Sequence, residues 1–265
     1  MAPTNPSSMP VSTADFSVSE LPPPGGLCAI HQPNFFPRLT TLAKLFAADY
    51  WIVLDNVQFT RRDYQHRARL AALDDPQRHQ WLSIPTHLPQ GRCTTIRDAR
   101  IADPAGSKRR VARMLTQYYS SSPHWLDLRP RLDAVLDRFD TSDRTADIAE
   151  TSTGVLLDLL GWTGQTLRGS ELPARHERSQ RLADLAAATR AKTYLCGTGG
   201  TRYLQPEPFD AAGVSVHRFS TPTSGLWTYA RDNSSLTTLM RDGSTHTAKA
   251  LLAVAVQHRP APHQR

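Results

Sequence analysis

The chain has 265 residues, of which 39% are hydrophobic and 21% charged, and its formal charge is +7. This composition excludes global disorder and suits one large domain or two small ones. The apolar run ALLAVAV (250–256) has seven residues, far fewer than the roughly 20 that a membrane helix needs. The basic charge attracts anions such as nucleic acid, a nucleotide or a phosphorylated small molecule, although solubility alone also explains it.

Residues 1–26 are rich in Pro, Ser and Thr and end in PPPGG, a composition that predicts a disordered leader. This segment lacks the basic start and apolar core of a secretion signal. Three cysteines, Cys28, Cys93 and Cys196, have no metal-ligand spacing and cannot all pair. A reducing cytoplasm therefore fits best, and no metal site is predicted.

The chain after the leader alternates between apolar strands and an amphipathic helix, which has Leu42, Leu45 and Phe46 on one face. A strand, a helix and a second strand at this short spacing predict a parallel, right-handed βαβ unit. The predicted elements of this part are strands at 27–30, 50–54, 81–84 and 96–101 and a helix at 39–48.

The rest of the chain predicts helices first and then two further strands. The predicted helices are 105–119, 124–139, 144–160, 178–191 and a short one at 236–240, and the predicted strands are 193–196 and 214–219. Gly161 is a suitable helix stop, and Asp232 or Asn233 is the expected cap of the short helix. We therefore expect one α/β domain over 27–243, with a mostly parallel, Rossmann-like sheet and a helical insertion at 104–161, followed by a weak helix and flexible tail at 244–265.

Three polar clusters follow predicted strands. They are His31-Gln32-Pro33-Asn34, Asp55-Asn56-Val57-Gln58 and Gly197-Thr198-Gly199-Gly200. Ligands of parallel α/β sheets bind at the carboxyl ends of the strands, so these clusters are expected to converge on one site.

His31 and Asp55 are the candidate proton-transfer residues. A histidine titrates near neutrality and can act as a general base or acid, or it can be a neutral ring that donates to a backbone carbonyl. Pro33 and Pro37 stiffen the loop around it, as a preformed site or any tight loop requires. Asp55 could orient a base, bind a metal or hold a ribose hydroxyl, or it could cap a turn with Asn56.

Two further stretches are candidates for anion binding. RRDYQHRAR (61–69) holds four arginines, and in a strand Arg67 and Arg69 would share one face, either to bind phosphate or carboxylate or as a solvated hairpin edge. CGTGGTRYL (196–204) is typical of a phosphate-cradling turn, although it matches neither the Walker nor the GxGxxG pattern. Cys196 would need a base partner to act as a nucleophile, and a buried inert thiol fits better.

The chain carries four motifs in order: HQPNFFP (31–37), LDNVQFTRRDYQHR (54–67), WLSIP (81–85) and YLCGTGGTRYL (194–204). Together they resemble the WbqC-like protein family, from residue 28 to residue 243. The matching positions are His31, Gln32, Pro33, Asn34, Pro37, Asp55, Gln58, Phe59, Gln65, Arg67, Gly197, Gly199, Gly200, Tyr203 and Leu204. The chain departs from the family at Arg38, His66 and Cys196, where tryptophan, asparagine and serine are usual. These departures concern the substrate more than the fold.

The resemblance implies a cytoplasmic biosynthetic enzyme that modifies an activated sugar or a specialised metabolite, because similar proteins are encoded among genes for O-antigen and other surface polysaccharides. The implied reaction class is acyl or aminoacyl group transfer. A histidine after the first strand is also a feature of nucleotidyl-transfer folds, but this analogy rests on position alone.

In the enzyme interpretation, His31 and Asp55 move protons, and the other site residues bind an anionic small molecule that is phosphorylated or nucleotide-linked. The expected substrate-binding residues are Gln32, Asn34, Gln58, Arg62, Gln65, Arg67, Gly197, Gly199, Gly200 and Tyr203. The alternative is a noncatalytic ligand-binding or scaffold protein of a biosynthetic assembly. Nucleic-acid binding is disfavoured, because basic and aromatic residues interleave only at 61–69. The sequence points to no particular cofactor or oligomeric state.

Overall fold

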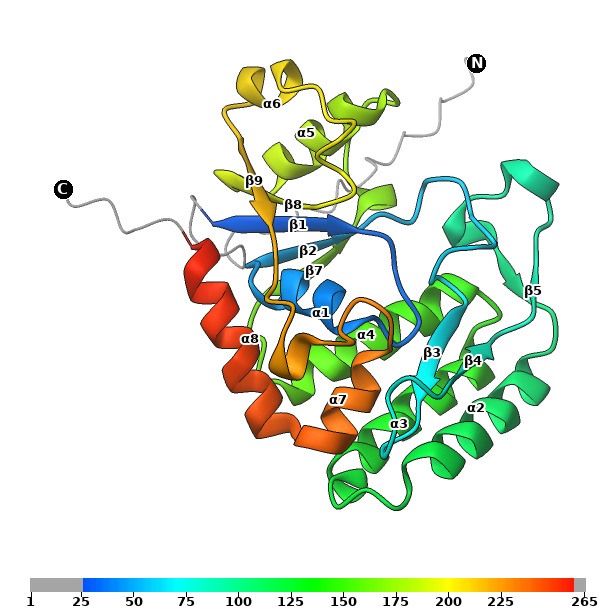
Figure 1. The fold of residues 1–265 in the computed structure, drawn as a ribbon. Coiled ribbons are helices and arrows are strands. Elements are labelled where there is room, and N and C mark those ends of the chain that lie inside the picture. Colours follow the sequence, from blue (N-terminus) through cyan, green and yellow to red (C-terminus); the bar gives the residue numbers. More distant parts are fainter. Residues whose placement is uncertain (1–25, 260–265) are drawn as a thin grey trace, which may run out of the picture.

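A parallel sheet of five strands forms the centre of the protein, as the computed structural model describes it for residues 26–259 (Figure 1). The strands are β1 (Leu27–His31), β2 (Tyr50–Val53), β7 (Gln165–Arg168), β8 (Thr193–Gly197) and β9 (Ser215–Phe219). Their order across the sheet is β7-β2-β1-β8-β9, so the first strand lies at the centre and the chain winds outward in both directions. This order is that of a Rossmann-type sheet and confirms the predicted fold class. The predicted leader lies outside the described residues, except for Gly26.

The βαβ unit at the start of the domain forms as predicted. β1 pairs in parallel with β2, from Cys28 beside Tyr50 to His31 beside Val53. Helix α1 (Leu39–Phe46) connects them and buries Leu39, Leu42 and Leu45 completely or nearly so. Because apolar side chains at helical spacing all face the sheet, their burial holds α1 against it.

Helices cover both faces of the sheet. On one face lie α1, α4 (Thr145–Leu159), α7 (Ser235–Asp242) and α8 (Ser244–His258), and on the other lie α5 (Arg178–Ala188) and α6 (Glu207–Ala211) (Figure 1). Side chains of a strand alternate between faces, so Leu27 and Ala29 of β1 join the core under α1 whereas Cys28 and Ile30 join the core under α5. By the same alternation, the side chain of His31 lies on the α1 side.

The helical insertion forms α2 (Pro104–Tyr119), α3 (Trp125–Thr141) and α4, close to the predicted bounds. The carboxylate of Asp103 caps α2 by accepting from Gly106 N at 2.9 Å, and Pro104 takes the first helical position. Beside these helices lie two antiparallel pairs: β3 (Arg67–Ala71) with β4 (His79–Ser83), and β5 (Thr86–His87) with β6 (Arg100–Ile101).

Several local predictions are wrong. Residues 96–101 are not one strand, because a 3₁₀ helix at Ile96–Asp98 precedes the two-residue β6. β7 was not predicted; it is an edge strand with half-exposed residues, so its sequence lacks an apolar run. Ser234, rather than Asp232 or Asn233, caps α7 by accepting from Leu236 N. The helix predicted after residue 243 does form: it is α8, which spans 15 residues and buries Leu251 and Val254.

Candidate functional site

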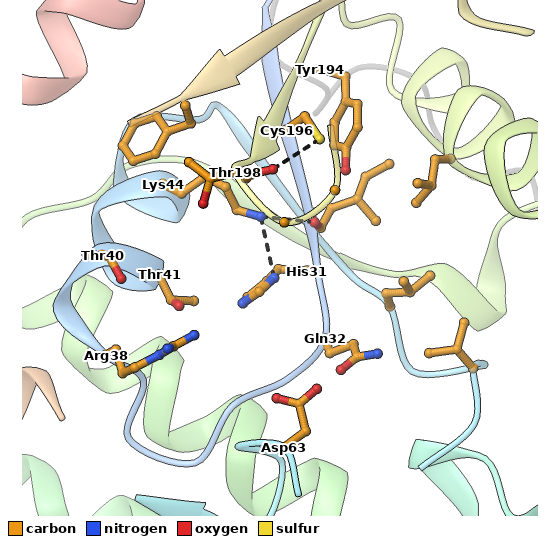
Figure 2. Close-up of a pocket in the computed structure, with 18 of the residues that line it drawn as sticks. His31, Gln32, Arg38, Thr40, Thr41, Lys44, Asp63, Tyr194, Cys196 and Thr198 are labelled. Carbon is orange, nitrogen blue, oxygen red and sulfur yellow. Dashed lines mark hydrogen bonds between the residues drawn. The ribbon is translucent and has the colours of Figure 1, made fainter. Parts of the chain in front are cut away.

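A cavity of about 850 Å³ lies at the carboxyl ends of β1, β8 and β9 (Figure 2). β1 and β8 are the strands from which the chain winds in opposite directions, and this is where open α/β sheets bind their ligands. The loop after β1, the N-terminal parts of α1 and α5, and the glycine-rich turn after β8 all line the cavity. The fold therefore brings the first and third predicted clusters together, along with Val57 and Gln58 of the second.

Lys44 and His31 form a pair in the wall of this cavity (Figure 2). The Nζ atom of Lys44, on α1, lies 3.4 Å from His31 Nδ1 and 3.3 Å from the carbonyl oxygen of Ile30. Lys44 is only 6% exposed and forms no ion pair with a carboxylate in the described part of the chain. It is an amine held at the end of β1 by two acceptors.

Burial and neighbouring charged groups set the protonation states of this pair. Burial lowers the pKa of the Lys44 amine to about 8, and the nearby thiols of Cys196 and Cys28 oppose this shift. The pKa of His31 lies well below its ordinary value, first because of burial and then because of the charges on Lys44 and Arg38; the Asn34 amide opposes the shift. At neutral pH the pair therefore consists of a protonated amine and a neutral imidazole.

This arrangement determines which ring nitrogen of the neutral His31 imidazole carries the proton. An ammonium has only donors, so Lys44 donates to His31 Nδ1, and the ring proton must reside on Nε2. His31 Nε2 is buried and has no hydrogen-bond partner among residues 26–259. His31 thus offers an N–H donor to a ligand while Lys44 offers a positive charge. A general-base role would require the proton to leave Nε2 first.

Five cationic side chains line the cavity: Arg38, Lys44, Arg178, Arg181 and Arg231. One carboxylate, Asp63, lines it as well, and none of the five cations forms an ion pair with any carboxylate of the described chain. Arginines elsewhere in the molecule commonly do, as Arg175 does with Asp184 at 2.7 Å. A concave wall with this excess of positive charge concentrates anions.

Gly197, Thr198, Gly199 and Gly200 form a turn on the cavity wall, where Gly200 N donates to Gly197 O at 2.9 Å. Gly200 is needed for a close approach, because a Cβ there would lie 2.7 Å from the sulfur of Cys196. Burial raises the pKa of the Cys196 thiol, so the thiol is protonated at neutral pH. This favours a packing role for Cys196 over a nucleophilic one.

The four predicted amide residues all have structural partners close to the site. Gln32 lines the cavity and accepts at its Oε1 from Nε2 of the fully buried Gln65, at 2.7 Å. Gln65 therefore positions Gln32 and does not itself line the cavity. Gln58 lines the cavity and donates to Arg92 O at 2.6 Å. Asn34 is buried, and its backbone carbonyl accepts from the hydroxyl of Thr153 on α4, which anchors the loop after β1.

Asp55 lies apart from His31, in a second cavity of about 340 Å³. It follows β2, and its carboxylate accepts from both the backbone N–H (2.9 Å) and the hydroxyl (2.7 Å) of Ser170, which follows β7. β7 and β8 lie on opposite sides of the β1-β2 pair, so this contact turns Asp55 away from the first cavity. Arginines and carboxylates already paired with one another, such as Arg168 and Glu150, share the second cavity.

The predicted anion-binding arginines lie outside the first cavity. Arg67 and Arg69 share one face of β3, as expected, and both stack on Trp81, with guanidinium carbons 4.2 and 4.9 Å from the ring centre. Arg67 also donates to the carbonyl oxygens of Asp63 and Arg62, and Arg62 itself is exposed. Tyr203 is 62% exposed and stacks under Arg178. It therefore contacts a residue that lines the cavity but does not line the cavity itself.

The structure adds cations that sequence reasoning missed. Lys44 resembles an ordinary helix lysine in the sequence, and only its place three residues after Thr41, on the buried face of α1, hints at its burial. Arg38 stood out as a departure from a family pattern; it lines the cavity and stacks on Tyr64 at 4.2 Å. Within residues 26–259, no group of three or more His, Cys, Asp or Glu side chains is placed to hold a metal ion.

The comparison with known families assigns the chain. Residues 32–233 match the model of the WbqC-like protein family. The chain belongs to this family. Among curated proteins it is similar to one of Mycobacterium tuberculosis (strain ATCC 25618 / H37Rv), named "Uncharacterized protein Rv1507c", with 23% identity over 192 residues that cover 72% of this chain and 80% of that protein. No solved structure matches the chain significantly. Between Gly26 and Arg259, no helix has the length and apolarity to cross a membrane.

Proposed function

We propose that this protein is a cytoplasmic biosynthetic enzyme whose cavity binds an anionic small molecule, phosphorylated or nucleotide-linked, and modifies it by group transfer. The substrate class that fits its family resemblance is an activated sugar or a specialised metabolite, and the reaction class is acyl or aminoacyl transfer.

The unpaired positive charge of the cavity is the observation that carries this proposal. Lys44 and the four arginines form no ion pair in the described chain, yet they face a single cavity at the switch point of the sheet. A ligand phosphate or carboxylate would supply the missing partner, since arginine binds such groups through two parallel hydrogen bonds.

His31 and Lys44 are the proposed reacting-centre residues. His31 Nε2–H can donate to a ligand oxygen, and Lys44 can stabilise negative charge that develops there, because both act in a site partly withdrawn from water. A positive group that is held in place stabilises developing negative charge more than a mobile group in water does. Asp55 takes no part in this proposal, since it lines the other cavity.

A thermal-shift panel tests ligand binding directly. The panel holds nucleoside diphosphates, nucleotide-sugars, acyl-CoAs, inorganic pyrophosphate and a duplex oligonucleotide, each added to the wild type, Lys44→Met and Arg110→Ala. A ligand at 100 times its Kd adds roughly 2.7 kcal/mol of stability. Arg110 is exposed on α2, outside the cavity, so its variant is the matched control for loss of one charge.

The proposal predicts that one class of small anion stabilises the wild type and Arg110→Ala but not Lys44→Met. Stabilisation by the oligonucleotide alone, equal in all three proteins and erased by salt, would contradict it in favour of nonspecific charge binding.

A noncatalytic ligand-binding protein is the second candidate, and one observation favours it. No hydrogen bond or ion pair joins His31 to a carboxylate among residues 26–259, so the ring lacks the orienting acid that a histidine base commonly has. The His31→Gln variant distinguishes the two functions. A binding protein would keep ligand affinity and yield no product in either form, whereas the enzyme would lose product formation, followed by mass spectrometry, while the ligand still binds.

A further inference from the structure

We propose that the cavity takes a small molecule with two separated anionic groups, one bound on each side of the sheet, and holds the part that joins them at His31 and Lys44. This inference rests on the proposed anionic ligand and specifies how its charges are spaced. It follows from where the four cavity arginines lie relative to the strand ends.

Arg38 and Arg231, the α1-side arginines, form the first group. Arg38 immediately precedes α1, which packs on one face of the sheet, and its Nη1 donates to Arg231 O at 2.9 Å. A second bond, from Thr40 N to Ala230 O, fastens the loop of Arg231 to the start of the same helix. These contacts keep the two arginines together on the α1 side.

Arg178 and Arg181, the α5-side arginines, form the second group. Arg178 is the first residue of α5, which packs on the opposite face of the sheet, and both side chains line the same cavity. Arg181 Nη2 donates to His176 O at 2.9 Å, and Arg178 stacks on Tyr203. Tyr194, whose side chain joins the core on this face, marks the same side of the cavity.

The strand ends separate the two groups. Figure 2 shows His31 and Lys44 between Arg38 on one side and Tyr194 with Cys196 on the other. Because α1 and α5 pack on opposite faces of the sheet, the two arginine groups approach the cavity from opposite sides. Two anionic groups joined by a spacer would satisfy both arginine pairs and bring the spacer against the His31 Nε2–H donor.

Calorimetric titration with synthetic probes tests the spacing. The probes are butyl phosphate, inorganic pyrophosphate and a series of linear alkane α,ω-bisphosphates of increasing length, each titrated into the wild type, Arg231→Ala, Arg178→Ala and Arg110→Ala. Arg231 and Arg178 are both exposed, so their alanine variants should fold, and far-ultraviolet circular dichroism verifies this. Arg38→Ala and Arg181→Ala provide a second variant on each side.

The inference predicts that one spacer length binds roughly tenfold or more tightly than butyl phosphate and pyrophosphate, and that Arg231→Ala and Arg178→Ala each remove most of this gain. Arg110→Ala should leave it intact. If every bisphosphate binds as butyl phosphate does, or only one side's variants weaken the best one, the cavity has a single anion subsite and the inference is wrong. If no probe binds the wild type, the proposed function fails as well.

Discussion

Lys44 Nζ approaches His31 Nδ1 to 3.4 Å, and both side chains line a cavity whose other charged groups are almost all positive. The charge on Lys44 disfavours protonation of His31, and burial disfavours the charged form of both groups. The pair thus holds a neutral imidazole beside an amine whose pKa is unusually low. An incoming anion would reverse part of this repulsion.

Removal of the Lys44 charge should raise the pKa of His31. We expect Lys44→Met to move it toward the ordinary value of 6.5 without reaching it, because burial and Arg38 still act on the ring. NMR titration of the histidine Cε1 protons measures the shift, with His31→Gln used to assign the signal among the 10 histidines. Lys249→Met, at an exposed position on α8, is the control and should leave His31 unchanged. A lower pKa in Lys44→Met would contradict the pairing.

Lys44 should also make stability depend on pH in the alkaline range. Its pKa is about 8 in the folded protein and 10.5 ordinarily, so between these values the unfolded chain binds the proton that the folded chain lacks. Stability from this group therefore increases as pH rises from 8 to 10.5. Relative to Lys44→Met, the wild type should gain about 2–3 kcal/mol over this window. Urea denaturation of both proteins at several pH values measures the difference, and a constant difference would refute the low pKa.

Asp55→Asn should weaken the fold and spare ligand binding. The carboxylate accepts two hydrogen bonds from Ser170, and an amide nitrogen in place of one oxygen would face a donor. We expect a loss of about 1–3 kcal/mol in the free energy of unfolding. Pyrophosphate affinity, measured by calorimetry on the folded variant, should match that of the wild type. Lost affinity with intact stability would instead place Asp55 in the ligand site.

The packing of Gly200 against Cys196 can be tested by substitution, with the neighbouring Gly199 as the control. A Cβ at Gly200 would lie 2.7 Å from Cys196 Sγ, whereas a Cβ at Gly199 would meet nothing within 4 Å. Gly200→Ala should therefore cost about 1–3 kcal/mol, and Gly199→Ala should be nearly neutral. Cys196→Ala should recover most of the loss when combined with Gly200→Ala. Equal effects of the two glycine variants in urea denaturation would show that the contact is unimportant.

Apolar runs and their spacing predict the central part of the fold. β1, α1, β2 and β8 form within a few residues of the predicted bounds because their side chains are buried, and burial leaves a clear pattern in the sequence. β7 escapes prediction because its sequence, QTLR, holds a single apolar residue. The segment at 96–101 misleads because isoleucines at both ends resemble a strand. Tertiary packing, which local pattern does not record, decides both cases.

The site is only partly predictable for a similar reason. His31 and the glycine turn lie at the ends of adjacent strands, so strand order alone brings them together. Asp55 also ends a neighbouring strand, but its hydrogen bonds to Ser170 direct it to the far side. Lys44 and Arg231 enter the cavity from separate helices and loops, and no sequence motif links them to His31. Side-chain direction, rather than position along the chain, separates these outcomes.

A crystal structure of the protein grown with inorganic pyrophosphate tests the central claim most directly. The account predicts phosphate oxygens in the cavity at the ends of β1 and β8, within hydrogen-bond distance of Lys44 Nζ or of the cavity arginines. Pyrophosphate bound only on the outer surface or in the cavity beside Asp55, with water alone next to Lys44 and His31, would contradict it.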